Sequence, residues 1–333
     1  MNFHRTPCVH MVTMSIRILG LAILTSLSAA VCSFAAVDSS LLALVPQNSQ
    51  FVAGINVAAS RDSDFGRYLS TRFSTDMKGF EELTAATGFD PRRDLQSLLF
   101  AGSSPVSEGD RDFKGIVLAR GTFDESKIRS AALAKGGVVQ SFSGVDLYTG
   151  GDGHRQNAFA FLQNDVLATG SIPQLKDAIT NRSARSTLNA QLQKLITQAG
   201  TYNDVWFATI APLSRFPMHF APGQDGRADA SQTLQAVSAA SGGIRFGSSL
   251  EITLDGIARS EKDASALADV LRFGASLLQM RGESDPNSAA LASALRQMIV
   301  TASGQNVHLA LSVPEATIEQ LAESRPQRRR LAH

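Results

Sequence analysis

Cysteine is almost absent from this sequence. Its two copies among 333 residues, Cys8 and Cys32, both lie in a segment that we expect to be removed. The remaining chain would have none, so it can form no disulfide and offers neither a thiol nucleophile nor a cysteine-bound metal site. Its stability must then come from the burial of apolar side chains.

Tyrosine and tryptophan are also scarce. The chain has three tyrosines and one tryptophan beside 18 phenylalanines. An open carbohydrate-binding face usually uses more Trp and Tyr, because these rings combine an apolar surface with a polar group. The composition gives no support to such a face, whereas a hydrophobic content of 44% is ordinary for a globular protein.

The common sequence signatures of catalysis and cofactor binding are missing. No G-x-S-x-G, Walker A, G-x-G-x-x-G or H-E-x-x-H pattern occurs. Four histidines follow residue 35, and none lies within five residues of another, so the sequence contains no local metal-binding pair. We therefore expect no cofactor and no metal. His154 is predicted at a hairpin tip, and His308 is predicted on the face of a strand.

The first 35 residues have the pattern of a secretory signal peptide. A basic start with Arg5 and Arg17 precedes an uncharged stretch over 18–37, which ends near the small residues Ser33 and Ala35. Export machinery reads this order of basic, apolar and small residues, and the small residues predict cleavage after Ala35. We therefore expect an extracytoplasmic protein, either periplasmic or secreted.

Other interpretations of this leader stay open. The uncharged stretch 18–37 has the about 20 residues that a spanning helix needs, so it could remain as an inner-membrane anchor. Only this anchor would place the protein on a membrane. Lipid attachment at Cys32 is disfavoured, because Val31 precedes it where Gly, Ala or Ser is usual. Translation could also begin at Met11 or Met14, and Met14 gives a leader of more usual length.

Cleavage changes the charge of the chain from slightly basic to slightly acidic. Loss of Arg5 and Arg17 reduces the 31 basic side chains to 29, against 30 acidic ones, which gives a net charge of −1. Four of the 29 are arginines in the last nine residues, so the rest of the mature chain carries about −5. This balance argues against nucleic acid as a partner. The basic tail 324–333 is expected to be a solvated end.

Alternating and periodic apolar residues predict a mixed α+β protein. A glycine-rich turn at 150–153 joins two strands that are expected to pair. The predicted strands are 51–57, 95–101, 115–120, 138–148, 158–169, 205–210, 250–258 and 306–313. The predicted helices are 62–71, 76–87, 261–280 and 286–302, with others beginning at 124, 171 and 314.

Two local matches indicate an internal duplication. Ala119-Arg120 and Ala258-Arg259, 139 residues apart, each close a predicted strand just before an acidic helix start. Ser171-Ile172-Pro173 and Ser312-Val313-Pro314, 141 residues apart, each join a strand to a helix. Proline suits that first turn because its missing N–H has no partner there, so Ser-x-Pro as a common helix opening is the alternative explanation. We predict two tandem ferredoxin-like or related βαββαβ-type units.

The 298 residues that follow the leader are enough for one large domain or two ordinary ones. The strand and helix pattern places the division after residue 200. We expect a signal peptide over 1–35, a first α+β unit over 36–200, a second α+β unit over 201–323, and a basic C-terminal tail over 324–333.

Three segments carry a resemblance to known proteins. The entry Leu41-Leu42-Ala43-Leu44-Val45-Pro46, the strand Phe51–Asn56 and the strand end Val166–Ser171 resemble a group of uncharacterised exported bacterial proteins, catalogued as domains of unknown function. These proteins share an N-terminal leader and a leucine–proline entry, followed by Asp or Asn, into the first strand. The resemblance covers most of the chain after the leader, and it implies neither an activity nor catalytic residues.

A long irregular segment over 212–228 is the best candidate interaction site in the sequence. Long loops in compact domains are often functional, and exposed apolar side chains tend to mark contact surfaces. The alternative is that this loop folds back over the core beside Trp206. The side chains predicted to make the contact are Arg215, Phe216, Met218, His219 and Phe220.

Two classes of function follow from this sequence. The first is a non-enzymatic exported binding or interaction protein of unknown ligand, with a protein or cell-envelope partner. The alternative is an extracytoplasmic hydrolase whose site is assembled only by folding. Carboxylate pairs such as Asp62 with Asp64, or Asp90 with Asp94, could serve it, although each pair also suits the positive end of a helix dipole.

Overall fold

The computed structural model describes residues 37–63, 66, 78–103, 115–150, 157–184, 187–213, 235–284, 286–314 and 317. The chain divides into two compact units, Met1–Phe34 and Ala35–His333, and every described residue belongs to the second. None of the described helices combines the length and the apolar composition needed to span a membrane.

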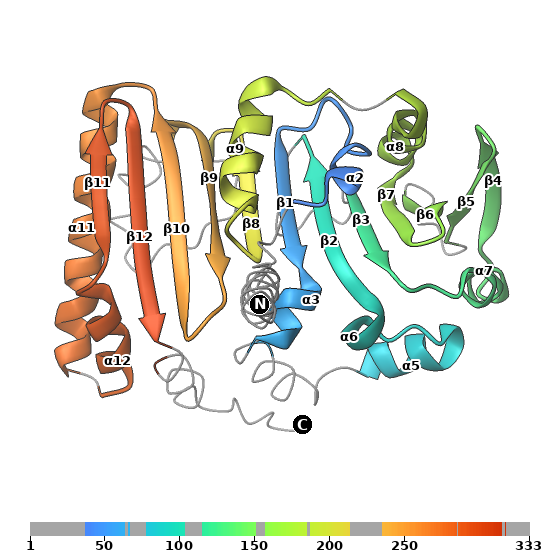
Figure 1. Ribbon diagram of the computed structural model, residues 1–333, viewed down its shortest axis with the longest axis horizontal. Coiled ribbons are helices and arrows are strands. Elements are labelled where there is room, and N and C mark those ends of the chain that lie inside the picture. The colour runs from blue at the N-terminus through green and yellow to red at the C-terminus, as the bar shows by residue number, and fades with distance from the viewer. Residues whose placement is uncertain are drawn as a thin grey trace, which may run out of the picture. The chain divides into compact units, whose positions relative to one another are not determined.

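The described strands form a single sheet in which every neighbouring pair is antiparallel (Figure 1). Its order is β11-β12-β10-β9-β8-β1-β2-β3-β7-β6-β5-β4. The α+β class is therefore confirmed. The strands are β1 (Phe51–Asn56), β2 (Leu95–Gly102), β3 (Gly115–Gly121), β4 (Val138–Phe142), β5 (Val145–Thr149), β6 (Asn157–Gln163), β7 (Val166–Ser171), β8 (Val205–Thr209), β9 (Val237–Arg245), β10 (Ser249–Ala258), β11 (Ile299–Ser303) and β12 (Asn306–Pro314).

Aspartate and asparagine side chains begin several of the described helices by accepting backbone N–H groups that have no partner inside the helix. Asp124 accepts from Lys127 N over 3.0 Å, as its predicted place at a helix start requires. The helices are α2 (Ser39–Leu42), α3 (Val57–Asp62), α5 (Lys78–Thr87), α6 (Pro91–Asp94), α7 (Glu125–Ala134), α8 (Ile172–Ala184), α9 (Ala190–Gly200), α11 (Glu261–Ser284) and α12 (Pro286–Leu295).

The two faces of the sheet carry separate cores. On the face that points toward the viewer in Figure 1, α2, α8 and α9 cover the middle strands and bury a large apolar cluster that includes Leu118, Leu175 and Ile196. On the opposite face, α11 packs against β10, β11 and β12 through a smaller cluster that includes Leu267 and Val307. Successive side chains of a strand point to opposite faces of the sheet. The register in which the strands pair therefore determines which residues enter each core.

Trp206, the single tryptophan of the chain, fits into the larger core because two glycines leave room for its ring. It lies opposite Gly54 in the pairing of β1 with β8 and is 6% exposed. A Cβ on Gly54 would lie 2.4 Å from the indole, and a Cβ on Gly200 would lie 3.1 Å from it. Both positions therefore require glycine for close approach rather than for backbone freedom.

We expect Gly54→Ala to lower the free energy of unfolding by about 2–3 kcal/mol, because the added methyl overpacks a close-packed site. Urea unfolding followed by the fluorescence of Trp206 measures this directly. Ala53→Gly, whose side chain points to the other face of β1, is the control and should cost only about 1 kcal/mol through lost strand propensity. An unchanged midpoint for Gly54→Ala would mean that the indole moves aside freely.

The sequence-based boundaries were wrong at several places. The predicted helix 62–71 begins where α3 (Val57–Asp62) ends. The predicted strands 138–148 and 158–169 are each a hairpin, one turning at Ser143-Gly144 and the other at 164–165. Ser143 and Gly144 both have positive φ, 48° and 77°, which is the geometry of a tight two-residue hairpin turn. The predicted helix 286–302 ends at Leu295, and β11 follows because Ile299, Val300 and Thr301 are β-branched.

The strand order differs from the predicted ferredoxin-like arrangement. In a split βαβ unit, a third strand lies between two strands that a helix connects. Here β1 and β2 are joined through α3, α5 and α6, yet they are direct antiparallel neighbours. The connection returns the chain beside its starting strand, so each half of the sheet begins with three consecutive neighbours, β1-β2-β3 in the first and β8-β9-β10 in the second.

Candidate functional site

The predicted interaction loop falls almost entirely between two described segments. Arg215, Phe216, Met218, His219 and Phe220 lie outside the described residues, which stop at Leu213 and resume at Gln235. His154 lies outside them as well. His308 is the exception, because it lies in β12, on the face of a strand as predicted.

His308 belongs to a row of polar side chains that crosses the second half of the sheet. The antiparallel register places Ser241 of β9 opposite Asp255 of β10, Asp255 opposite His308 of β12, and His308 opposite Thr301 of β11. Residues opposite one another in a sheet share a face, so these four side chains form one line. We call Ser241, Asp255, His308 and Thr301 the polar row.

A corresponding row in the first half of the sheet is entirely apolar. It crosses β2, β3, β7 and β6 in the same order of neighbours, and it lies on the same face as the polar row. Its members are between 0% and 2% exposed and lie in the core beneath α8. We call Leu99, Leu118, Ala168 and Ala160 the apolar row.

No described helix lies over β10, β12 and β11 on the face of the polar row, whereas α9 reaches β9 (Figure 1). Ser241 is accordingly 1% exposed, while the side chains of Asp255 and His308 are 31% and 44% exposed. The row thus runs from the buried edge of the core out to Thr301, which is exposed on the last strand of the sheet. One end of this face is therefore hydrogen-bonding surface that faces solvent.

Asp255 orients the imidazole of His308. The Nδ1–H of His308 donates to Asp255 Oδ1 over 2.8 Å, since a carboxylate oxygen can only accept. This bond fixes the proton on Nδ1 of the neutral ring, so Nε2 is left with a lone pair that can accept a hydrogen bond or a proton. The Oγ of Ser241, beside Asp255, is buried and makes no hydrogen bond within the described part of the chain.

A second carboxylate lies on the same face, four residues before Asp255. Glu251 Oε1 accepts from Ser249 Oγ over 2.5 Å and from Ser312 Oγ over 2.8 Å. These two bonds, with the positive charge of Arg245, lower the pKa of Glu251 against the opposing effect of its burial. Glu251 is therefore an anion at neutral pH. We call the polar row together with Glu251 and Ser312 the polar face.

The side chains of the polar face are hydrogen-bonding groups. Within the described ranges, no three histidine, cysteine or acidic side chains come close enough together to hold a metal ion. The predictions that the protein needs no metal and no cofactor stay predictions. What the polar face offers is two carboxylates, one oriented imidazole and several hydroxyls on a rigid sheet.

A cavity of about 530 Å³ lies between α2 and the ends of β1, β2 and β3. Arg120 at its wall donates from Nε to Asp38 Oδ2 over 2.6 Å and also bonds Asp165 and Ser40. Burial alone would raise the pKa of Asp38, but the hydrogen bonds from Arg120, Ser40 and the Leu41 N–H lower it. Because every one of these groups is already paired, Arg120 acts as a clamp between α2 and the β6–β7 turn.

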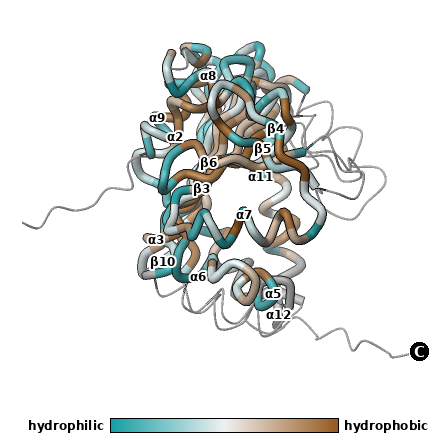
Figure 2. The backbone as a smooth tube through the Cα atoms, turned by 90° about the vertical axis from the view of Figure 1, so that its right-hand side faces the viewer, coloured by the Kyte–Doolittle hydropathy of each residue, from teal (hydrophilic) through white to brown (hydrophobic). Residues whose placement is uncertain are grey.

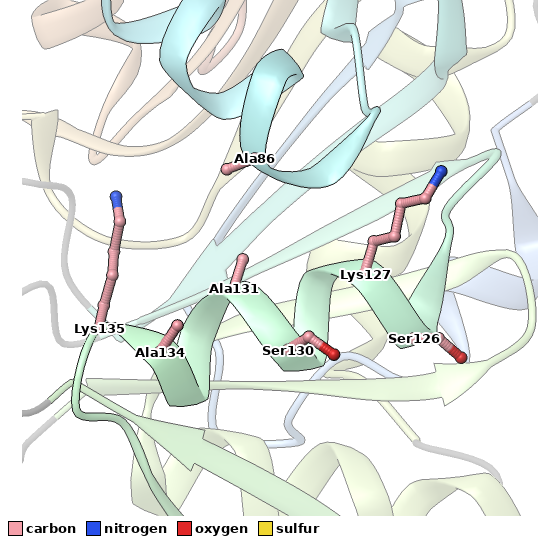
Figure 3. Close-up of a pocket in the computed structure, with 7 residues that line it drawn as sticks. All are labelled: Ala86, Ser126, Lys127, Ser130, Ala131, Ala134 and Lys135. Carbon is pink, nitrogen blue, oxygen red and sulfur yellow. The ribbon is translucent and has the colours of Figure 1, made fainter.

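A groove of about 510 Å³ lies between α5 and α7 (Figure 3). Lys127 and Lys135 stand near its two ends, with the small side chains of Ala86, Ala131 and Ala134 between them. Lys127 is paired with Asp124, Nζ to Oδ2 over 3.2 Å. The lining residues are exposed or half-buried and hold no fixed polar group, so the groove carries no assignable chemistry.

Comparison with known proteins gives little. No protein-family model matches the chain, and no curated protein matches it. The similar solved structures include crystal form I of TP0453, 11% identical over 87% of this chain and 98% of that chain with a TM-score of 0.46, and crystal form IV of TP0453, 8% identical over 84% and 96% with a TM-score of 0.44. At this level the likeness assigns no function.

Sequence reasoning missed Asp255, Thr301 and Ser241. A signal was present, since Glu251, Thr253 and Asp255 alternate with apolar residues in β10, and His308 does so in β12. Such alternation predicts a strand with one polar face. It does not predict which strands are neighbours, so the row itself could not be found without the register.

Proposed function

We propose that this chain is an exported, non-enzymatic binding protein that binds a cationic ligand on the polar face. The leader supports export, because it has the basic, apolar and small segments of a signal peptide. The observation that carries the binding site is the contrast between the two rows. Matching positions hold core in one half of the sheet and, at Asp255, His308 and Thr301, open hydrogen-bonding side chains in the other.

We also propose that the two halves of the sheet are structural repeats. In that case the two rows occupy equivalent positions, and the contrast between them is strong support for the site. If Phe51 corresponds to Val205 and Ile55 to Thr209, exchanging β1 and β8 leaves their pairing unchanged. This is because Phe51 lies opposite Thr209 and Ile55 lies opposite Val205. The orders β1-β2-β3-β7-β6 and β8-β9-β10-β12-β11 then correspond outward from that pair, with β4 and β5 as an addition to the first half. This gives a repeat of a type related to, but distinct from, the ferredoxin-like unit.

Two backbone hydrogen bonds support the same correspondence. Gly121 N–H, at the end of β3, donates to Asp165 O in the β6–β7 turn over 3.0 Å. Ala258 N–H, at the end of β10, donates to Gln305 O in the β11–β12 turn over 2.8 Å. The two sequence matches fall on corresponding strands, β3 with β10 and β7 with β12, but are displaced by one or two residues from the register of the two rows. Polar side chains thus stand in the second repeat at positions that belong to the core in the first. Such a replacement indicates that these positions have a different role in the second repeat.

The chemistry of the polar face favours a ligand that carries ammonium or guanidinium groups. Glu251 and Asp255 present carboxylate oxygens, and Thr301 and Ser312 present hydroxyls that can accept. Hydrogen bonds between N–H cations and carboxylates are the stronger, charge-assisted kind. A strand scaffold keeps these acceptors in fixed positions, which lowers the entropy lost on binding.

Titration calorimetry with tetralysine as the probe tests the proposal, with neutral maltotetraose as the second arm. We expect tetralysine to bind the native chain, and Asp255→Asn with His308→Ala to weaken binding by about tenfold or more, since hydrogen bonds to charged groups contribute about 1.5–3 kcal/mol each. Lys135→Ala, in the α5–α7 groove, is the matched control and should bind as the native chain does. If neither probe binds the native chain more tightly than the double variant, the polar face is not the site.

Export has its own test. Mass spectrometry of the N-terminus after cell fractionation should find a chain that begins at Ala36 outside the cytoplasm. A chain that retains residues 18–37 in the membrane fraction would contradict cleavage and support the anchor instead.

The order of groups in the polar row also supports a second candidate, the hydrolase. Thr301, His308 and Asp255 follow one another as hydroxyl, imidazole and carboxylate, the order of a nucleophile, its base and an orienting acid. Hydrolysis of p-nitrophenyl acetate by the native chain should then fall by about a hundredfold in Thr301→Ala and in Asp255→Asn. Equal rates for all three proteins reject this candidate and leave binding.

A further inference from the structure

The sheet ends in two edge strands, β4 and β11, that differ in one respect. An edge strand has backbone N–H and C=O groups on one side that no neighbouring strand satisfies, and proteins usually protect such edges with charges, proline or a covering helix. Neither β4 nor β11 contains a charged residue or a proline. The protection must therefore come from elsewhere in the structure.

The β11 edge is partly occupied by a side chain of α11. The two-residue turn 304–305 makes Ser303 and Asn306 a hydrogen-bonded pair. Hydrogen-bonded and non-hydrogen-bonded pairs alternate along antiparallel strands, so Thr301 also bonds to β12. The backbone N–H and C=O groups of Val300 and Ala302 therefore point away from β12. Arg272 of α11 donates from Nη2 to the outward carbonyl of Val300 over 2.8 Å. One of the few backbone groups to which a further strand could hydrogen-bond is thus already occupied.

The β4 edge has no such protection within the described residues. Its turn at Ser143-Gly144 pairs Phe142 with Val145, so by the same alternation Val139 and Ser141 point their N–H and C=O groups away from β5. No described residue forms a hydrogen bond with these four groups. The strand is also exposed, with Val138 at 57% and Val139 at 42%.

We propose that β4 pairs antiparallel with β4 of a second copy of this chain, with the two copies related by a twofold axis at Gln140. Val139 then faces Ser141 of the partner subunit, and the reverse pair forms on the other side of the axis, so four backbone hydrogen bonds close between the strands. Only an extended strand satisfies this spacing of donors and acceptors.

The sequence of β4 favours its own copy as the occupant. In this register Val138 meets Phe142 of the partner subunit, an aromatic and β-branched pair of the kind that stabilises neighbouring strands. The strand has no charge, so it meets itself without repulsion. A twofold pairing also uses up the β4 edges and leaves only the β11 edges, on each of which Arg272 occupies an outward carbonyl, so the assembly stops at two copies instead of growing into a fibre.

Sedimentation velocity on the full chain, expressed with its own leader and purified after export, tests the dimer over about 1–200 μM. Strand pairing alone gives a small interface, so we expect a dissociation constant of about 1–100 μM. Val139→Pro removes an outward N–H without removing a bond to β5 and should weaken the dimer at least about tenfold. Ala302→Pro, the same change on the β11 edge, is the matched control and should leave the dimer unchanged.

A charge exchange at the axis keeps the test decisive if the proline variant folds poorly. Gln140→Lys and Gln140→Glu, each alone, place like charges opposite one another and should both be monomeric, whereas their mixture should restore the dimer. A native chain that is monomeric throughout the concentration range overturns the proposal, even if β4 binds an extended peptide from another protein. A dimer that neither Gln140→Lys nor Val139→Pro weakens overturns it as well, because that dimer uses another surface.

Discussion

Leu118→Asp should leave the chain unfolded or close to it, whereas Asp255→Leu should fold with nearly native stability. The two positions correspond in the two rows, but Leu118 is 0% exposed beneath α8 and the side chain of Asp255 is 31% exposed. A carboxylate at position 118 loses apolar burial and gains no partner, which costs more than about 4 kcal/mol of a total stability of about 5–15 kcal/mol. Leucine at position 255 loses one half-exposed hydrogen bond, a change within about 1 kcal/mol.

Urea unfolding monitored by circular dichroism measures both variants. Leu118→Ala separates the cost of the cavity from that of the buried charge and should lose about 3 kcal/mol, less than Leu118→Asp. A small loss for Leu118→Asp, or unfolding of Asp255→Leu, would show that the two rows do not differ in burial as described. The proposed binding site would then lose its main support.

Arg120→Met should lower the free energy of unfolding by about 3 kcal/mol at neutral pH. The substitution keeps an apolar stem of similar length but removes the partner of Asp38, which is left partly buried without its counterion. The bonds from Arg120 to Asp165 and Ser40 are lost together with it, so α2 loses its tie to the β6–β7 turn.

The effect of Arg120→Met should depend on pH in one direction. The pKa of Asp38 in the folded chain lies below its ordinary value of 3.8. Its contribution to stability is therefore complete above 3.8 and is lost as the pH falls through the lowered value. Urea unfolding at about pH 7 and about pH 3 should show the native chain losing its advantage over the variant in acid.

Arg93→Met is the matched control for the clamp. Arg93 also pairs with an aspartate, Nε to Asp94 Oδ1 over 2.7 Å, but its side chain is 69% exposed. An exposed pair contributes about 0–1 kcal/mol, so this variant should unfold almost as the native chain does. Equal losses for Arg120→Met and Arg93→Met would contradict the role of Arg120 as a clamp.

Much of the fold follows from local sequence. The Asp124 cap, the apolar runs of β1 and β3 and the alternation in β12 each predict their element, because capping and periodicity depend on residues close together in the chain. The hairpin at Ser143-Gly144 was missed because serine rarely takes a positive φ. β9 was missed because Val237–Arg245 is rich in Ala, Ser and Gly, which become a strand only between β8 and β10.

The candidate site depends on information that local sequence does not contain. His308 could be assigned to a strand face, but its partner Asp255 is 53 residues away and is brought opposite it only by the register of β10 with β12. The difference in burial between Leu118 and Asp255 depends on where α8 lies, which is a tertiary fact. The sequence-based loop candidate around His219 stays a prediction.

The pairing of β1 with β8 has a consequence for the order in which the chain can fold. Phe51 and Thr209 are neighbours although more than 150 residues separate them, so β1 keeps one open side until the second half of the chain is available to pair with it. Such distant contacts slow folding, because a long loop must close before the pairing gains any energy. Until β8 is in place, the first half is therefore a sheet with an open edge at β1 as well as at β4. The period before β8 arrives is when we expect the chain to depend most on chaperones and to aggregate most easily.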